Sequence, residues 1–66
     1  MENDRVVNDK EAAAFLGLAP QTLRSARHYG RGPVYHKLGR RVVYKITDLQ
    51  RYLAERRIDP EVGEGV

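Results

Sequence analysis

Apolar residues in the first half of the chain follow helical spacing in two short segments separated by a glycine. Ala12, Phe15 and Leu16 precede Gly17, while Leu23 and Ala26 follow Pro20. Asn8 with Glu11 three residues later forms a capping-box pattern, and Gly17 suits the left-handed end of a helix. The pattern predicts helices over residues 9–16 and 20–29, joined by a short turn. This is the helix-turn-helix arrangement.

The predicted second helix has uneven end signals. Pro20 suits its first position, where a missing N–H costs nothing, and Gly30 is the expected stop. Ala19 stands where a hydroxyl or carboxylate cap is preferred, so we expect a weaker start than usual.

Residues beyond Gly30 predict two strands and a third helix. Residues 34–37 and 41–45 are rich in β-branched and aromatic side chains, and Gly39 between them suits a hairpin turn. Thr47 with Gln50 predicts a capping box for a helix over residues 48–57. The predicted fold is therefore a small α+β winged helix-turn-helix in residues 8–58. We expect an N-terminal arm over residues 1–7 and an acidic flexible tail over 59–66.

The predicted core is thin, because a chain this short buries only about 60% of the surface that its unfolded form exposes. We expect one set of side chains to be buried: Phe15, Leu16, Leu18, Leu23, Val42, Tyr44, Ile46, Leu49 and Leu53, with Val6 or Val7 at one end. Tyr35 and Tyr44 occupy positions with strand spacing in the two predicted strands, and we expect Tyr35 in the same core as Tyr44. A base-stacking role for these two tyrosines is the alternative.

Positive charge is concentrated in the middle of the chain. Residues 20–46 contain no carboxylate and seven basic residues, Arg24, Arg27, Arg31, Lys37, Arg40, Arg41 and Lys45, whereas the net charge of the whole chain is only +3. This asymmetry favours a polyanionic partner that contacts one continuous surface. A solvated basic face without a partner is the alternative.

The predicted second helix carries side chains suited to reading DNA. In a helix-turn-helix the second helix enters the major groove, where Gln pairs with adenine, Arg with guanine, and Thr or Ser with base edges or phosphates. The major-groove candidates are Gln21, Thr22, Arg24, Ser25 and His28. The alternatives are pairing of Arg24 and Arg27 with Glu11 or Asp48, and a plain surface position for His28.

The hairpin supplies a second group of candidates. Arg40 and Arg41 at a tight turn form a cationic tip that can follow phosphates or enter a minor groove. The strand lysines Lys37 and Lys45 extend this surface, and Arg27 and Arg31 are further candidates for phosphate contacts. Arg56 and Arg57 suit the C-terminal end of the third helix.

The inventory of reactive residues argues against catalysis. The chain has no cysteine, one serine, and two histidines outside any metal-ligand motif, and its glycines lack the lysine and hydroxyl of a phosphate loop. We therefore expect no enzyme activity, cofactor, metal or small-molecule substrate. No apolar stretch approaches the roughly 18 residues needed to cross a bilayer. The first residues lack a signal-peptide layout, so we expect a cytoplasmic protein without a membrane partner.

Two segments resemble a known family. EAAAFLGLAPQTLR and GRGPVYHKLGRRVVYKITDLQRYLAERR resemble AlpA-type regulators and small phage or integrative-element excisionases, a MerR-like winged-helix group. The resemblance implies recognition-helix contacts at Gln21, Thr22, Arg24 and Ser25, and wing contacts at Arg40 and Arg41. Position 26 is often Trp in similar sequences, so Ala26 implies a smaller or differently filled core there. Ala19 replaces the usual hydroxyl cap, and with it a backbone phosphate contact.

The resemblance also implies a role. Such proteins bind direct repeats of double-stranded DNA cooperatively, bend the DNA, and either steer an integrase toward excision or regulate a nearby promoter. The predicted function is that of an excisionase-type recombination directionality factor, bound at the nucleoid, with an integrase partner and head-to-tail self-association on DNA. An AlpA-like transcriptional regulator of a mobile-element promoter is the main alternative. A protein-interaction module and an RNA-binding domain are more remote ones.

Overall fold

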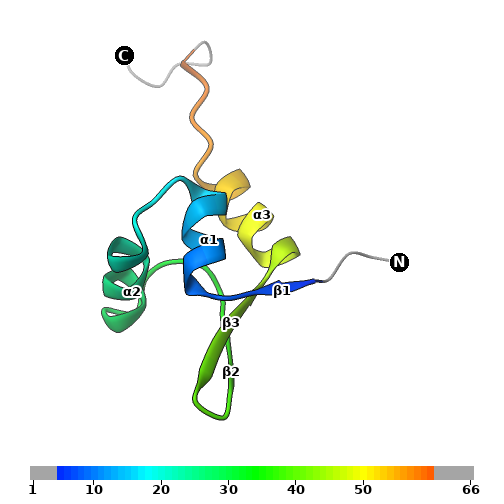
Figure 1. Ribbon diagram of the computed structural model, residues 1–66. Helices are drawn as coiled ribbons and strands as arrows, with labels where there is room; N and C mark the ends of the chain where they lie inside the picture. The colour runs from blue at the N-terminus through cyan, green and yellow to red at the C-terminus, as the bar shows by residue number, and fades with distance from the viewer. Residues whose placement is uncertain (1–4, 61–66) are drawn as a thin grey trace.

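The computed structural model describes residues 5–60, in which three short helices surround a core and a β-hairpin projects from it (Figure 1). Helix α1 (Asp9–Leu16) contacts both α2 (Pro20–His28) and α3 (Ile46–Glu55). The hairpin joins β2 (His36–Leu38) to β3 (Arg41–Lys45). The winged helix-turn-helix prediction is confirmed. The outer parts of the predicted arm and tail, residues 1–4 and 61–66, lie outside the described residues.

Helix α1 has the predicted bounds because both of its ends are fixed by local hydrogen bonds. The backbone N–H of Glu11 donates to Asn8 Oδ1 at 2.8 Å, and the N–H of Asn8 donates to Glu11 Oε1 at 3.1 Å. At the other end Gly17 has φ +74°, and the Leu18 N–H donates to the Ala13 carbonyl at 2.8 Å. A 6→1 bond with a left-handed glycine is the Schellman ending.

Helix α2 begins at Pro20 without a side-chain cap from Ala19, as predicted. It ends at His28, one residue before the predicted end, and Tyr29 is its C-cap. Gly30 has φ +73°, and the Arg31 N–H donates to the Ala26 carbonyl at 2.7 Å. The same Schellman geometry therefore closes both helices of the motif.

The sheet has three antiparallel strands in the order β1-β3-β2. The short strand β1 (Val6–Val7) pairs with the end of β3, and Val7 lies opposite Tyr44. The sequence analysis assigned residues 1–7 to an N-terminal arm and predicted no strand there, so β1 is an element that it missed. A strand this short carries no recognisable alternation, and its conformation depends on hydrogen bonds to a strand far along the chain.

The first strand of the hairpin is displaced from its predicted bounds of 34–37, whereas β3 has the predicted bounds of 41–45. Leu38 pairs with Arg41, while Val34 and Tyr35 precede the ladder. Only Gly39 and Arg40 remain for the turn, and only Gly39 has a positive φ, +64°. A glycine at the first central position is typical of the tight type II′ turn, which allows the ladder to reach Leu38.

Helix α3 begins two residues earlier than predicted, and the Thr47–Gln50 capping box is not its start. Lys45, the last residue of β3, is the N-cap, without a side-chain cap hydrogen bond. The Ile46 N–H donates to the Arg5 carbonyl at 3.0 Å. The residue that directly precedes β1 therefore satisfies the first amide of the helix. Arg56 is the C-cap, and Arg57 lies beyond the helix.

The core confirms only part of the predicted set. Leu23, Tyr44 and Leu49 are fully buried, and Leu16, Val42 and Ile46 pack against them. Val7 is buried, as expected for one end of the core, and Ala12, Ala13, Pro33 and Val43 are buried in addition to the predicted set. Phe15, Leu18, Leu53 and Tyr35 are exposed, so their prediction as core residues was wrong.

The error in α1 has a geometric cause. Ala12, Ala13 and Leu16 occupy one face of α1, and this face packs against the rest of the core. Phe15 then falls on the flank, where 40% of its surface is exposed. Small alanines let the neighbouring helices approach closely, and a simple hydrophobicity pattern favours the larger phenylalanine instead.

Candidate nucleic-acid interface

The polar face of α2 is held outward by one deeply buried anchor. Leu23 is 1% exposed and fixes the rotation of the helix about its axis. All five major-groove candidates are exposed on the helix: Gln21, Thr22, Arg24, Ser25 and His28. Ala26 lies on the inner side next to the loop after α2, where a Cβ on Gly32 would be 3.4 Å from Ala26 Cβ. This close loop accounts for a small residue at position 26.

Arg27 points inward from α2 and joins three elements. Its Nη1 donates to Asp9 Oδ1 at 2.7 Å and to the Tyr44 hydroxyl at 2.9 Å, and its side chain is only 20% exposed. The hydrogen bond to Asp9 raises the pKa of Arg27 above its usual value, and burial opposes that rise. The guanidinium also lies over the Tyr35 ring, 5.6 Å from its centroid. The geometry gives Arg27 a structural position, while its predicted phosphate contact stays a prediction.

Arg24 shares the same carboxylate from the solvent side. Its Nε lies 3.3 Å from Asp9 Oδ2, and half of its side chain is exposed. The sequence had suggested Glu11 or Asp48 as partners for these arginines, but their partner is Asp9. Glu11 is occupied in the α1 capping box, and Asp48 faces His36 with Oδ2 3.6 Å from Nε2.

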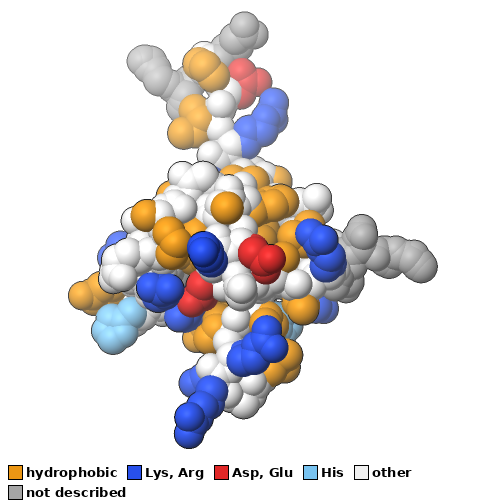
Figure 2. Space-filling view, in the orientation of Figure 1, with side chains coloured by type: hydrophobic (Ala, Val, Ile, Leu, Met, Phe, Trp, Pro, Cys, Tyr) orange, Lys and Arg blue, Asp and Glu red, His pale blue; other side chains and the backbone are white. Residues whose placement is uncertain are grey.

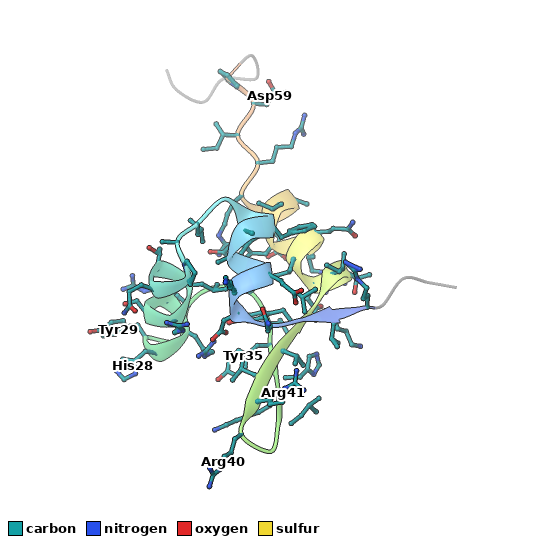
Figure 3. All side chains as sticks on the ribbon, viewed as in Figure 1. His28, Tyr29, Tyr35, Arg40, Arg41 and Asp59 are labelled. Atoms are coloured by element: carbon teal, nitrogen blue, oxygen red, sulfur yellow. The ribbon has the colours of Figure 1, made fainter. Side chains whose placement is uncertain are left out.

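The hairpin candidates divide into two groups. Lys37, Arg40 and Arg41 are exposed around the turn, and Figure 3 shows Arg40 at its far end. Lys45 lies at the opposite end of β3, where it pairs with Val6 and caps α3. The structure therefore separates Lys45 from the three basic residues around the hairpin turn.

The residues after α2 add features that the sequence analysis did not assign. Tyr29 is 69% exposed and packs edge-on against His28, with ring centroids 5.0 Å apart. Figure 3 shows both rings at the outer end of α2. A shallow hollow on this helix is lined by Gln21, Arg24, Ser25, Arg27, His28 and Tyr29. The sequence does contain a signal for this position, because Tyr29 is an aromatic residue directly before Gly30, the glycine that stops α2.

Basic side chains gather on the projecting hairpin and toward α2, as Figure 2 shows for one face of the molecule. Arg31 is exposed in the loop that follows α2, and its backbone N–H closes the helix. The predicted basic middle of the chain thus lies on two neighbouring projections, α2 with its following loop and the hairpin.

The chain matches the family model described as the helix-turn-helix domain over residues 7–57. This protein belongs to the helix-turn-helix domain family. It is a small DNA-binding protein with a winged helix-turn-helix fold, and duplex DNA is the partner that the family implies. No curated protein matches the chain in sequence.

The described part of this helix-turn-helix protein offers neither a metal site nor a membrane-spanning helix. Within residues 5–60, no three His, Cys, Asp or Glu side chains are grouped to hold a metal ion. None of the helices in that range is long and apolar enough to cross a membrane. Domains of this family are typically non-enzymatic DNA binders.

Proposed function

We propose that this helix-turn-helix protein is an excisionase-type recombination directionality factor that reads duplex DNA with α2 and the hairpin together. The observation that supports this most directly is the exposure of Arg24 on α2 and Arg40 on the hairpin, in a middle segment without carboxylates. A helix in the major groove and a cationic wing at the adjacent minor groove or phosphates fit this arrangement.

The major-groove contacts are assigned to Gln21, Thr22, Arg24, Ser25 and His28. Arg24 has to exchange part of its contact with Asp9 for a base or phosphate, and a separation of 3.3 Å with half exposure makes this exchange inexpensive. Lys37, Arg40 and Arg41 contact the backbone or minor groove beside this site. Arg31, Arg27 and Lys45 are the remaining phosphate candidates.

Cooperative binding to repeats extends this proposal. A single module of this size covers about 600–1,000 Å² on DNA, which limits its specificity. We propose that several copies bind repeats side by side, bend the DNA and direct an integrase toward excision. The two sequence segments resemble excisionases and AlpA-type regulators alike, so the resemblance supports both of these roles over other DNA-binding roles.

The test begins with a duplex selected by the protein from a random-sequence pool. Arg24→Ala should weaken binding to the selected duplex by about 10-fold or more while the thermal unfolding midpoint changes little. Arg57→Ala removes the same charge at the far end of the molecule and is the matched control. Equal affinity of the wild type, Arg24→Ala and Arg57→Ala for the selected duplex would exclude the proposed interface.

Footprinting then separates the two roles. Protection of repeats next to an integrase core site, with a sigmoidal binding curve on a multi-site fragment, supports the excision role. Protection of a promoter alone would assign the protein to the AlpA-like regulators instead. Binding of a protein partner without any duplex binding would favour an interaction module.

A further inference from the structure

The tip of the hairpin carries an exposed leucine among basic residues. Leu38 is the last residue of β2 and is 59% exposed. Gly39 and Arg40 follow it, and Arg41 is its partner across the ladder. A large apolar side chain at the end of a projecting cationic hairpin contributes little to the core, whose buried set does not include it.

The ladder places the leucine beside a cation. Leu38 and Arg41 are directly paired, so their side chains leave the same face of the hairpin about 5 Å apart at Cβ. Lys37, one residue earlier, points to the opposite face because side chains alternate along a strand. The tip therefore presents one apolar group flanked by basic groups on both faces and by Arg40 at its end.

The dimensions of the tip restrict where it fits on DNA. The two-residue turn with Gly39 at φ +64° makes the hairpin no wider than one strand pair at its end. Paired strands lie about 4.8 Å apart, and the minor groove of B-DNA is about 6 Å wide. Only the leading side chains of such a tip can reach the floor of that groove, unless the groove opens.

We propose that Leu38 is an apolar wedge that enters the minor groove beside the α2 site and partly unstacks one base step. Leucine is among the side chains that insert between base steps and bend the duplex toward the major groove. Arg40 and Arg41 supply the attraction that holds the tip at the groove, where the electrostatic potential is most negative in narrow A·T-rich stretches. This inference rests on the proposed DNA binding and assigns the bend to a named residue.

The experiment compares Leu38→Ala with Leu38→Met and Leu53→Ala on the selected duplex. Leu53 is an exposed leucine at the other end of the fold, so Leu53→Ala makes the same chemical change away from the tip. The bend is measured by energy transfer between dyes on the duplex ends. Unstacking is measured with 2-aminopurine placed at successive steps beside the α2 footprint.

We expect the wild type to increase 2-aminopurine fluorescence at one step and to shorten the end-to-end distance. Leu38→Ala should abolish most of both signals, Leu38→Met should keep them, and Leu53→Ala should leave them unchanged. Affinity should change on the order of threefold or less for Leu38→Ala, because the lost apolar contact is offset by the avoided unstacking.

Three results would overturn the wedge. Unchanged bending and fluorescence in Leu38→Ala, with binding still sensitive to Arg24→Ala, would remove the wedge and leave DNA binding intact. An equal effect of Leu53→Ala would show that the signals do not arise at the tip. Absence of any duplex binding by the wild type would instead remove the proposed function itself.

Discussion

Arg27 Nη1 lies 2.7 Å from Asp9 Oδ1, so α2 is tied directly to the first residue of α1. The same nitrogen donates to the Tyr44 hydroxyl at 2.9 Å, which extends the connection to β3. Asp9 also lies in the first turn of α1, where the helix dipole favours a negative charge. One carboxylate thus helps to set the position of α2 relative to the rest of the domain.

Replacing Asp9 by Asn should destabilise the fold. The substitution leaves the partly buried Arg27 guanidinium without its counter-charge, so we expect a loss of about 1–2 kcal/mol in the free energy of unfolding. Urea denaturation would measure it. Glu55→Gln is the matched control, because it removes one carboxylate from an exposed ion pair with Arg56 and should cost less than about 0.5 kcal/mol. Equal losses for the two variants would contradict a special role for Asp9.

Tyr44→Phe isolates the second bond of Arg27. The ring stays buried, and only the hydroxyl that accepts from Nη1 is lost, so a cost of about 0.5–1.5 kcal/mol is expected. In a double-mutant cycle with Asp9→Asn the two losses should not be additive, since both partners share one guanidinium. Tyr52→Phe serves as a control for removal of a phenol hydroxyl. Arg56 Cζ lies 3.8 Å from the centroid of the Tyr52 ring, and the substitution keeps this ring.

The core assignment of α3 can be tested with two leucines one turn apart. Leu49 is completely buried, whereas Leu53 is 44% exposed. Leu49→Ala should therefore cost about 2–5 kcal/mol and can prevent folding at room temperature. Leu53→Ala should cost less than about 1 kcal/mol, as expected for partial burial. Similar values for both in calorimetry would restore Leu53 to the core.

Gly17 tests the ending of α1. Its φ of +74° is strained for any residue with a Cβ, although a Cβ built at this position would meet no atom within 4 Å. Gly17→Ala should thus lose roughly 1–2 kcal/mol from backbone conformation alone. Gly17→Asn should lose less, because asparagine tolerates the left-handed region better. The comparison of the two unfolding midpoints separates backbone strain from steric contact.

The hairpin contribution to binding can be read from salt dependence. If about 4–6 phosphates are neutralised, log K should fall against log salt with a slope of about −4 to −5. Arg40→Ala should make this slope shallower by about 1. Arg57→Ala, at a position that is 73% exposed beyond α3, should leave it unchanged. A slope that responds equally to both substitutions would point to net charge and not to the hairpin.

Local chemistry made several elements predictable from the sequence. The bounds of α1 followed from Asn8, Glu11 and Gly17, because each hydrogen bond at its ends spans only a few residues. The order of the elements from α1 onward followed from helical spacing together with the β-branched strand segments, and helical spacing also gave the buried Leu23 and the outward α2 side chains. The basic middle of the chain could be identified from the positions of the charged residues alone.

Other features were decided by contacts between distant residues. Strand β1 exists because Val6 and Val7 pair with β3, and the start of α3 is fixed by the hydrogen bond that the Ile46 N–H donates to the Arg5 carbonyl. The choice of Asp9 as the partner of Arg24 and Arg27 depends on the packing of α1 against α2. Burial of Ala12 and Ala13 in place of Phe15 depends on how closely those helices approach.

The sequence by itself therefore determined most of the local elements and the chemical character of the face that we propose as the DNA interface. Tertiary structure decided which basic residues stay exposed there, since Arg27 turns inward to Asp9 and Lys45 lies away from the hairpin turn. The physical reason is range: capping bonds and helical periodicity act over a few residues, whereas ion pairs and ladder register depend on three-dimensional packing.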